Sequence, residues 1–302
     1  MLNTHLCKYR MAHYLGQAQG RLTDAPACRI IHSDSEILLH NMTRSLSGVQ
    51  SVLRAIRLLK MFTDAHPEWR LKDLARAVEM NKATTYRLLS ALEAEGLLMR
   101  DARTGAYRLG PEIIALGGRA LRSNDLRSAG YAELEWLACA AGEAATLEIL
   151  VDDQVLILEE IPASHLVAPW QTIGTRHPAH ATSTGKLLLA FLPPHERVAH
   201  LRPPLQRLTE KTITDLEALE QQMALIRAQG YATAIEELED GYVAVSAPVR
   251  NHDGEVVAAI SIGGPITRLN AGRLTECIAL VRQAGRRISE RLGFREYLSE
   301  SA

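Results

Sequence analysis

The chain has 302 residues, which is long enough for two domains with ordinary hydrophobic cores. Its apolar content is that of a soluble protein, and no run approaches the roughly 18 apolar residues that a membrane span requires. The formal net charge of −1 hides a split: residues 42–122 carry 14 Lys and Arg against 8 Asp and Glu, and residues 123–302 carry 16 against 24. We therefore expect the first part of the chain to meet a polyanion.

Residues 1–44 show no sustained periodicity and no long apolar stretch of the signal-peptide kind. We expect a disordered extension without assigned function, which is either a natural arm or the product of a start codon placed too far upstream. The next stretch, Ser47–Phe62, is apolar at helical spacing. It predicts a helix that packs beneath the helix over residues 82–95.

Residues 70–110 predict a winged helix-turn-helix, within a domain that we bound at 45–110. Leu71, Leu74, Ala75 and Val78 mark a first helix. Asn81 is a good N-cap for a second helix that ends before Gly96. Two short apolar segments then flank residues 101–105, a polar turn suited to a hairpin. In this module the second helix enters the DNA major groove.

The second helix has a polar face that is free of carboxylates until Glu93. Helical spacing places Leu88, Leu89 and Leu92 toward the core, together with Thr85, and points Arg87 outward. Arginine is suited to the two acceptors of a guanine edge, and hydroxyls and lysine are suited to phosphates. The predicted DNA-binding residues are Lys82, Ala83, Thr84, Thr85, Tyr86, Arg87, Ser90 and, in the wing, Arg103.

Beyond the wing, Pro111 begins a helix that we expect to continue to residue 126 as a linker. Residues 127–296 then alternate between helices and hairpin-linked strands. They predict an α/β domain with a largely antiparallel sheet. Within it, Thr214 and Glu217 form a capping box that opens a helix ending at Gly230.

These motifs resemble the IclR family of bacterial transcription regulators. The resemblance is carried by residues 82–89 (KATTYRLL), 95–98 (EGLL), 104–110 (TGAYRLG) and 174–186 (GTRHPAHATSTGK), and it covers roughly 250 residues. It implies a GAF-like effector domain, a homodimer or dimer of dimers, a double-stranded operator and a small-molecule effector. We expect a repressor that acts in the cytoplasm without contact to a membrane.

The resemblance also suggests where an effector binds. The helix that begins near Thr182 offers N–H groups and hydroxyls to an anion, and Arg176 or His180 would add charge. Family members that sense small oxo-acids tend to have four polar residues where this chain has Ala234, Ala244, Ser261 and Gly263. Because three of those polar groups are missing, we expect an aromatic or hydrophobic carboxylate. The predicted effector-binding residues are Arg176, His180, Thr182, Ser183, Thr184, Ala234, Ala244, Ser246, Ser261 and Gly263.

Other functions have less support in the sequence. The histidines at 165, 177 and 180 lack a metal-binding context, and the four cysteines lack CxxC spacing, so we predict neither a metal nor a cofactor. A small-molecule enzyme with an accessory helix-turn-helix is the alternative, but no GxSxG elbow or other catalytic signature is present. A redox switch would require Cys139 or Cys277 to be exposed, and Cys277 is expected in the core.

Overall fold

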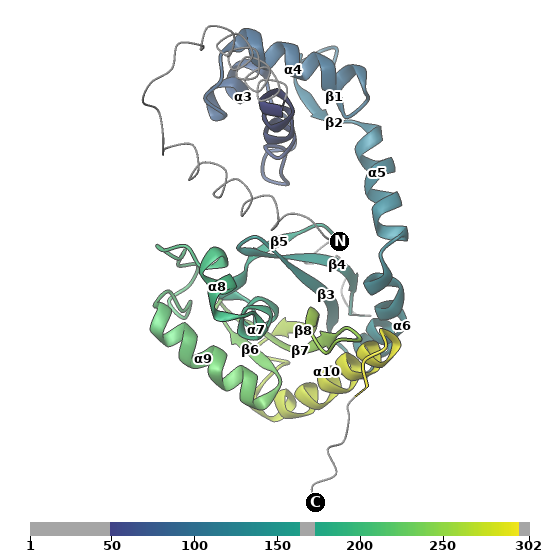
Figure 1. The fold of residues 1–302 in the computed structure, drawn as a ribbon, viewed down its shortest axis with the longest axis vertical. Coiled ribbons are helices and arrows are strands. Elements are labelled where there is room, and N and C mark those ends of the chain that lie inside the picture. The colour runs from purple at the N-terminus through teal and green to yellow at the C-terminus, as the bar shows by residue number, and fades with distance from the viewer. Residues whose placement is uncertain (1–48, 164–172, 296–302) are drawn as a thin grey trace, which may run out of the picture. The chain divides into compact units, whose positions relative to one another are not determined.

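The computed structural model describes residues 49–163 and 173–295 (Figure 1). The chain divides into two compact units, residues 1–115 and 116–302. The expectation for residues 1–44 lies outside the described residues. Among those that are described, no helix is both long enough and apolar enough to cross a membrane.

The first unit is the predicted winged helix-turn-helix. A helix over residues 49–59 precedes α3 (Leu71–Ala77) and α4 (Lys82–Ala94), and the wing consists of β1 (Leu98–Arg100) and β2 (Tyr107–Leu109). The Asn81 side chain caps α4 by accepting a hydrogen bond of 2.7 Å from the Thr84 amide. Gly96 follows α4 with a φ of 69°, the left-handed conformation expected after a helix end.

The helix over residues 49–59 packs differently from the prediction. Leu58 is fully buried against Leu74 and Leu89, but the apolar residues before it are exposed: Val49, Val52, Leu53 and Ile56. Its core contact is therefore confined to the end of the helix, and much of its apolar stripe is uncovered within the described part of the unit.

The predicted linker helix ends four residues earlier than expected. α5 (Pro111–Arg122) ends before Ser123, and α6 (Asp125–Ala141) begins after Asn124, whose side chain accepts a hydrogen bond from the Arg127 amide. A new N-cap inside the predicted helix explains the break.

The second unit contains a six-stranded antiparallel sheet in the order β5-β4-β3-β8-β7-β6. Its strands are β3 (Ala144–Val151), β4 (Gln154–Ile161), β5 (Arg176–Pro178), β6 (Ala232–Ile235), β7 (Tyr242–Arg250) and β8 (Val256–Pro265). This confirms the predicted α/β domain with an antiparallel sheet.

Helices cover both faces of this sheet (Figure 1). α6 and α10 (Ala271–Arg291) pack on one face, and Cys277 lies fully buried among them as expected. α7 (Ser183–Phe191) and α9 (Leu216–Gln229) pack on the other. A short helix, α8 (Pro194–His200), was not predicted, and α9 is capped by Asp215 rather than by Thr214.

A buried ion pair joins α7 to the segment after β6. The Lys186 ammonium lies 2.5 and 2.6 Å from the two carboxylate oxygens of Glu237, and the lysine is completely buried. Burial lowers the pKa of Lys186 and raises that of Glu237, and each charge opposes the shift of the other. Each residue therefore depends on its partner to remain charged inside the protein.

We predict that Lys186→Met lowers the free energy of unfolding by about 3–5 kcal/mol, because it leaves Glu237 buried without a counterion. The double variant Lys186→Met/Glu237→Leu should recover most of that loss. Urea denaturation followed by far-UV circular dichroism measures both.

Lys211→Met is the matched control, because Lys211 pairs with Glu236 at the surface. It should cost less than about 1 kcal/mol. A Lys186→Met protein as stable as this control would show that the buried pair does not hold α7.

Candidate functional site

The outward face of α4 is available to DNA. Lys82, Ala83, Tyr86 and Arg87 are exposed, and Thr84 and Ser90 are half-buried. No carboxylate lies in the first turn of the helix. The helix therefore presents hydroxyl, amine and guanidinium donors to its surroundings, as the sequence predicted.

Thr85 corrects the predicted set. Its side chain is completely buried, and its hydroxyl donates a 3.0 Å hydrogen bond to the Asn81 carbonyl. Helical spacing already placed it toward the core with Leu89 and Leu92, which are also buried. Thr85 supports the start of the helix and does not face the DNA groove.

The wing turn is fixed by one carboxylate. Asp101 accepts hydrogen bonds from the amides of Arg103 and Thr104, at 2.9 and 2.6 Å, and from the Thr104 hydroxyl. These bonds lower the pKa of Asp101, the one from the Thr104 amide most. Arg103 is exposed at the tip of this turn, where its side chain is free to reach a phosphate.

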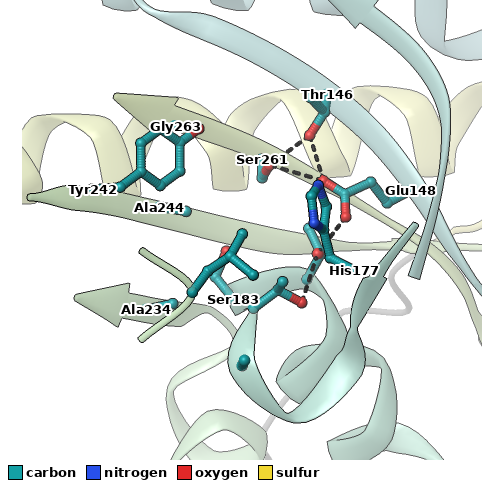
Figure 2. Close-up of a pocket in the computed structure, with 13 residues that line it drawn as sticks. Thr146, Glu148, His177, Ser183, Ala234, Tyr242, Ala244, Ser261 and Gly263 are labelled. Atoms are coloured by element: carbon teal, nitrogen blue, oxygen red, sulfur yellow. Dashed lines mark hydrogen bonds between the residues drawn. The ribbon is translucent and has the colours of Figure 1, made fainter. Parts of the chain in front are cut away.

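A cavity lies between the sheet and the amino end of α7 (Figure 2). Two cross-strand rows form its floor. One row is small and apolar, because Ala244 pairs with Ala234 on one side and Gly263 on the other. The other is polar, because Ser261 pairs with Thr146. The lining residues are Thr146, Glu148, His177, Ala181, Thr182, Ser183, Thr184, Ala234, Leu238, Tyr242, Ala244, Ser261 and Gly263.

Seven of the ten residues predicted to bind an effector line this cavity: Thr182, Ser183, Thr184, Ala234, Ala244, Ser261 and Gly263. Three do not. Arg176 is exposed on β5, and His180 is buried with its Nε2 atom 2.8 Å from the Gln206 carbonyl. Ser246 is completely buried next to Ser261 but outside the lining.

Glu148 is the cavity residue that the sequence prediction omitted. Its Oε1 atom accepts a 2.6 Å hydrogen bond from the Thr146 hydroxyl, and its Oε2 atom accepts one of 2.6 Å from Thr184. The Ser261 hydroxyl lies 3.5 Å from Oε1 and 2.7 Å from Thr146. Three elements, β3, β8 and α7, thus supply hydroxyls to one carboxyl group (Figure 2).

The charge of Glu148 has no counterion in this cavity. None of the described residues that line it is a lysine or arginine. Burial raises the pKa of Glu148, and the three hydroxyls oppose that rise.

Glu148 also changes what the amino end of α7 offers to an anion. Like charges 4 Å apart repel by about 4 kcal/mol at an effective dielectric constant of 20. A helix amino terminus attracts an anion by only about 0.3–1 kcal/mol. An acid placed beside an ionised Glu148 therefore meets net repulsion, unless one of the two carboxyl groups takes up a proton.

Tyr242 fills part of the same space. Its ring lies over Gly263, so closely that a Cβ atom on Gly263 would overlap its hydroxyl (Figure 2). The cavity retains about 30 Å³ of free space, roughly two water molecules. A neighbouring hollow of about 310 Å³ shares Tyr242 and Gly263 in its lining. Tyr242 and Gly263 therefore border both spaces.

His177 reaches the cavity from β5 in place of the expected Arg176. Burial lowers the pKa of His177, which favours the neutral ring. Its Nε2 atom is buried without a hydrogen-bond partner in the structure. His177 is thus a further titratable group in the cavity lining, beside Glu148 and Tyr242.

Comparison with known proteins assigns both units to one family. Residues 51–102 match the IclR helix-turn-helix domain, and residues 118–290 match the C-terminal domain of the bacterial transcriptional regulator IclR. The chain belongs to the IclR family of transcription regulators. It is a DNA-binding regulator with an effector domain, so the alternative of an enzyme is not supported.

Individual relatives span nearly the same length. The glycerol operon regulatory protein of Streptomyces griseus is 32% identical over 251 residues, which are 82% of this chain and 97% of the relative. The transcriptional repressor AllR of Klebsiella pneumoniae is 30% identical over 249 residues, 82% of this chain and 92% of AllR.

A solved structure shows similarity over nearly the same length. An IclR homologue from Microbacterium hydrocarbonoxydans, crystallised with 4-hydroxybenzoate, is 28% identical with a TM-score of 0.69, covering 80% of this chain and 98% of its own.

A signal for Glu148 was present in the sequence. It is the single charged residue within β3, AATLEILV, and alternation along the strand puts it on the same face as Thr146. A charge inside a buried strand marks either a paired group or a binding site. The role of Tyr242 depends on the conformation of its ring, which no sequence pattern specifies.

We predict that Glu148→Gln raises the melting temperature by about 2 °C or more at pH 8. Because the folded protein raises the pKa of Glu148, its favourable contribution is present below the unfolded value and is lost as the pH rises through the folded value. The neutral amide avoids that loss, so the gain should be larger at pH 8 than at pH 5. Scanning calorimetry at both pH values measures it.

Glu133→Gln is the matched control. Glu133 is also buried, but it pairs with Arg287 and Arg291, so its neutralisation should destabilise the protein. Identical pH profiles for the wild-type protein and Glu148→Gln would contradict an ionisable, uncompensated Glu148.

Proposed function

We propose that this IclR-family regulator represses transcription and is controlled by a small molecule bound in the cavity beneath α7. The observation that carries the proposal is one chain with an exposed, donor-rich recognition helix and an enclosed cavity at the expected effector position. The relative AllR, named as a repressor, supports the direction of control. Such a regulator acts in the cytoplasm, where its operator lies.

For DNA recognition we propose that Arg87 contacts a guanine edge, where its guanidinium matches two acceptors. Lys82, Thr84 and Ser90 supply phosphate contacts, with Ala83 and Tyr86 at the groove surface. Arg103 contacts the backbone from the wing. These roles agree with the exposure of each side chain.

We propose a homodimer, or a dimer of dimers, on a two-fold operator. Exposed apolar side chains support it: Val49, Val52 and Leu53 on the first helix and Ile114 on α5. Of these, Ile114 is 79% exposed. A second copy of the chain would cover such a surface.

For the effector we propose an aromatic or hydrophobic body. Ala234, Ala244 and Gly263 offer a small apolar floor, and the ring of Tyr242 already lies over it. The homologue crystallised with 4-hydroxybenzoate supports an aromatic ligand. A carboxylate on that ligand would bind at the amino end of α7, next to Ser183 and Thr184, only with the uptake of a proton, because Glu148 lies beside Thr184. The ligand displaces Tyr242, because the free space is too small for a ring.

We predict that Arg87→Ala weakens specific operator binding by about 1–3 kcal/mol, because it removes a base contact. Specific binding is measured by fluorescence anisotropy with DNA from upstream of the protein's own gene, in the presence of a competitor duplex. Transcription from the same DNA is measured in a run-off assay. The wild-type protein should reduce transcript and the variant should not.

Arg202→Ala, which removes an exposed charge from the second unit, is the control and should bind like the wild-type protein. Unchanged binding by Arg87→Ala would move base recognition to another residue. An increase in transcript on addition of the wild-type protein would overturn the proposal that it is a repressor.

We predict that Tyr242→Ala binds aromatic probes such as benzyl alcohol about tenfold more tightly, because no ring has to be displaced. Ligand-observed NMR with the full-length protein measures the affinities. Tyr131→Ala, which truncates a tyrosine exposed on α6, is the control. Weaker binding by Tyr242→Ala would show that Tyr242 contacts the ligand rather than occupying its place.

A further inference from the structure

Glu148 is unusual among the groups that surround the cavity. Its carboxyl group is buried, and the residues before and after it in β3, Leu147 and Ile149, are apolar. The structure gives it hydroxyl partners from β3, β8 and α7, and each of these residues also lines the cavity.

The hydrogen bonds leave Glu148 with unused acceptor capacity. A carboxylate has about four acceptor positions. Among the described residues, two donors are close, the hydroxyls of Thr146 and Thr184, both at 2.6 Å. Ser261, at 3.5 Å, is at the limit of a hydrogen bond. A donor that enters the cavity therefore finds lone pairs available.

The charged and titratable groups near Glu148 do not replace that donor. Lys186, two residues beyond Thr184 on α7, directs its ammonium to Glu237. His177 from β5 and Tyr242 from β7 are the other titratable residues in the described lining. The hydrogen bonds to Glu148 come from Thr146, Thr184 and Ser261, and the described lining contains no lysine or arginine. Within that lining the carboxyl group thus has no cationic partner.

We propose that Glu148 is a specificity-determining residue, which selects effectors that offer a hydroxyl or ammonium donor and rejects those that offer only a carboxylate. This inference rests on the proposed function, since it assigns the polar end of the ligand whose apolar body the cavity floor accepts. The donor lies against Glu148, between Thr146 and Thr184. An effector with a carboxylate alone offers no donor to Glu148, and it adds a second negative charge wherever Glu148 is ionised.

The test uses three probes that share one ring: benzyl alcohol, benzylamine and benzoate. Their affinities for the full-length protein are measured by ligand-observed NMR at pH 7.5, in the wild-type protein and in Tyr242→Ala. We expect the alcohol and the amine to bind at least about tenfold more tightly than benzoate in both proteins. Glu148→Gln should reduce binding of the amine and strengthen binding of benzoate by a similar factor.

Two further variants serve as controls. Glu148→Asp keeps the charge and should keep the order of the probes. Ser246→Ala removes a buried hydroxyl from the neighbouring strand outside the lining and should leave all three affinities unchanged. Circular dichroism confirms that each variant is folded.

Two results would overturn the inference, and they differ in what else they overturn. If benzoate is the tightest of the three in the wild-type protein, or if Glu148→Gln leaves the order unchanged, Glu148 does not select the ligand and the proposed aromatic effector stands. If no probe binds even in Tyr242→Ala, the proposed effector class fails together with the inference. If Glu148→Gln does not fold, the order of the three affinities in the wild-type protein decides the inference by itself.

Discussion

The cavity beneath α7 depends on how closely the amino end of that helix approaches the sheet. Gly185 has no side chain, and a Cβ atom there would overlap the backbone of Ala179. One residue later, Lys186 is held by Glu237 in the protein interior. This close packing brings Thr184 to Glu148 and leaves a narrow space above the small residues of β6, β7 and β8. If α7 lay farther from the sheet, these groups would be separated and water would fill the space between them.

The sequence predicted most of the fold because strong local signals agreed with the tertiary structure. Asn81, Gly96 and Gly230 mark helix ends as expected. Two local predictions were wrong. Asn124 is a cap within a stretch predicted as one helix, and Asp215 competes successfully with Thr214 for the start of α9.

The site was less predictable, because side-chain partners come from distant segments. Arg176 and Lys186 both lie near the expected anion site in sequence, yet one is exposed and the other pairs with Glu237, 51 residues away. The partners of Glu148 come from three elements, and the position of Tyr242 depends on the absence of a side chain at Gly263. Motif resemblance located the cavity and its floor, but not the acid within it.

In this account the cavity controls DNA binding through a difference in ligand affinity between two arrangements of the regulator. The decisive measurement is reciprocal linkage: operator affinity with and without saturating ligand, and ligand affinity with and without operator. The account predicts that both affinities fall by the same factor, about 5- to 150-fold for a typical coupling free energy. A ligand that binds in the cavity and leaves operator affinity unchanged would contradict it.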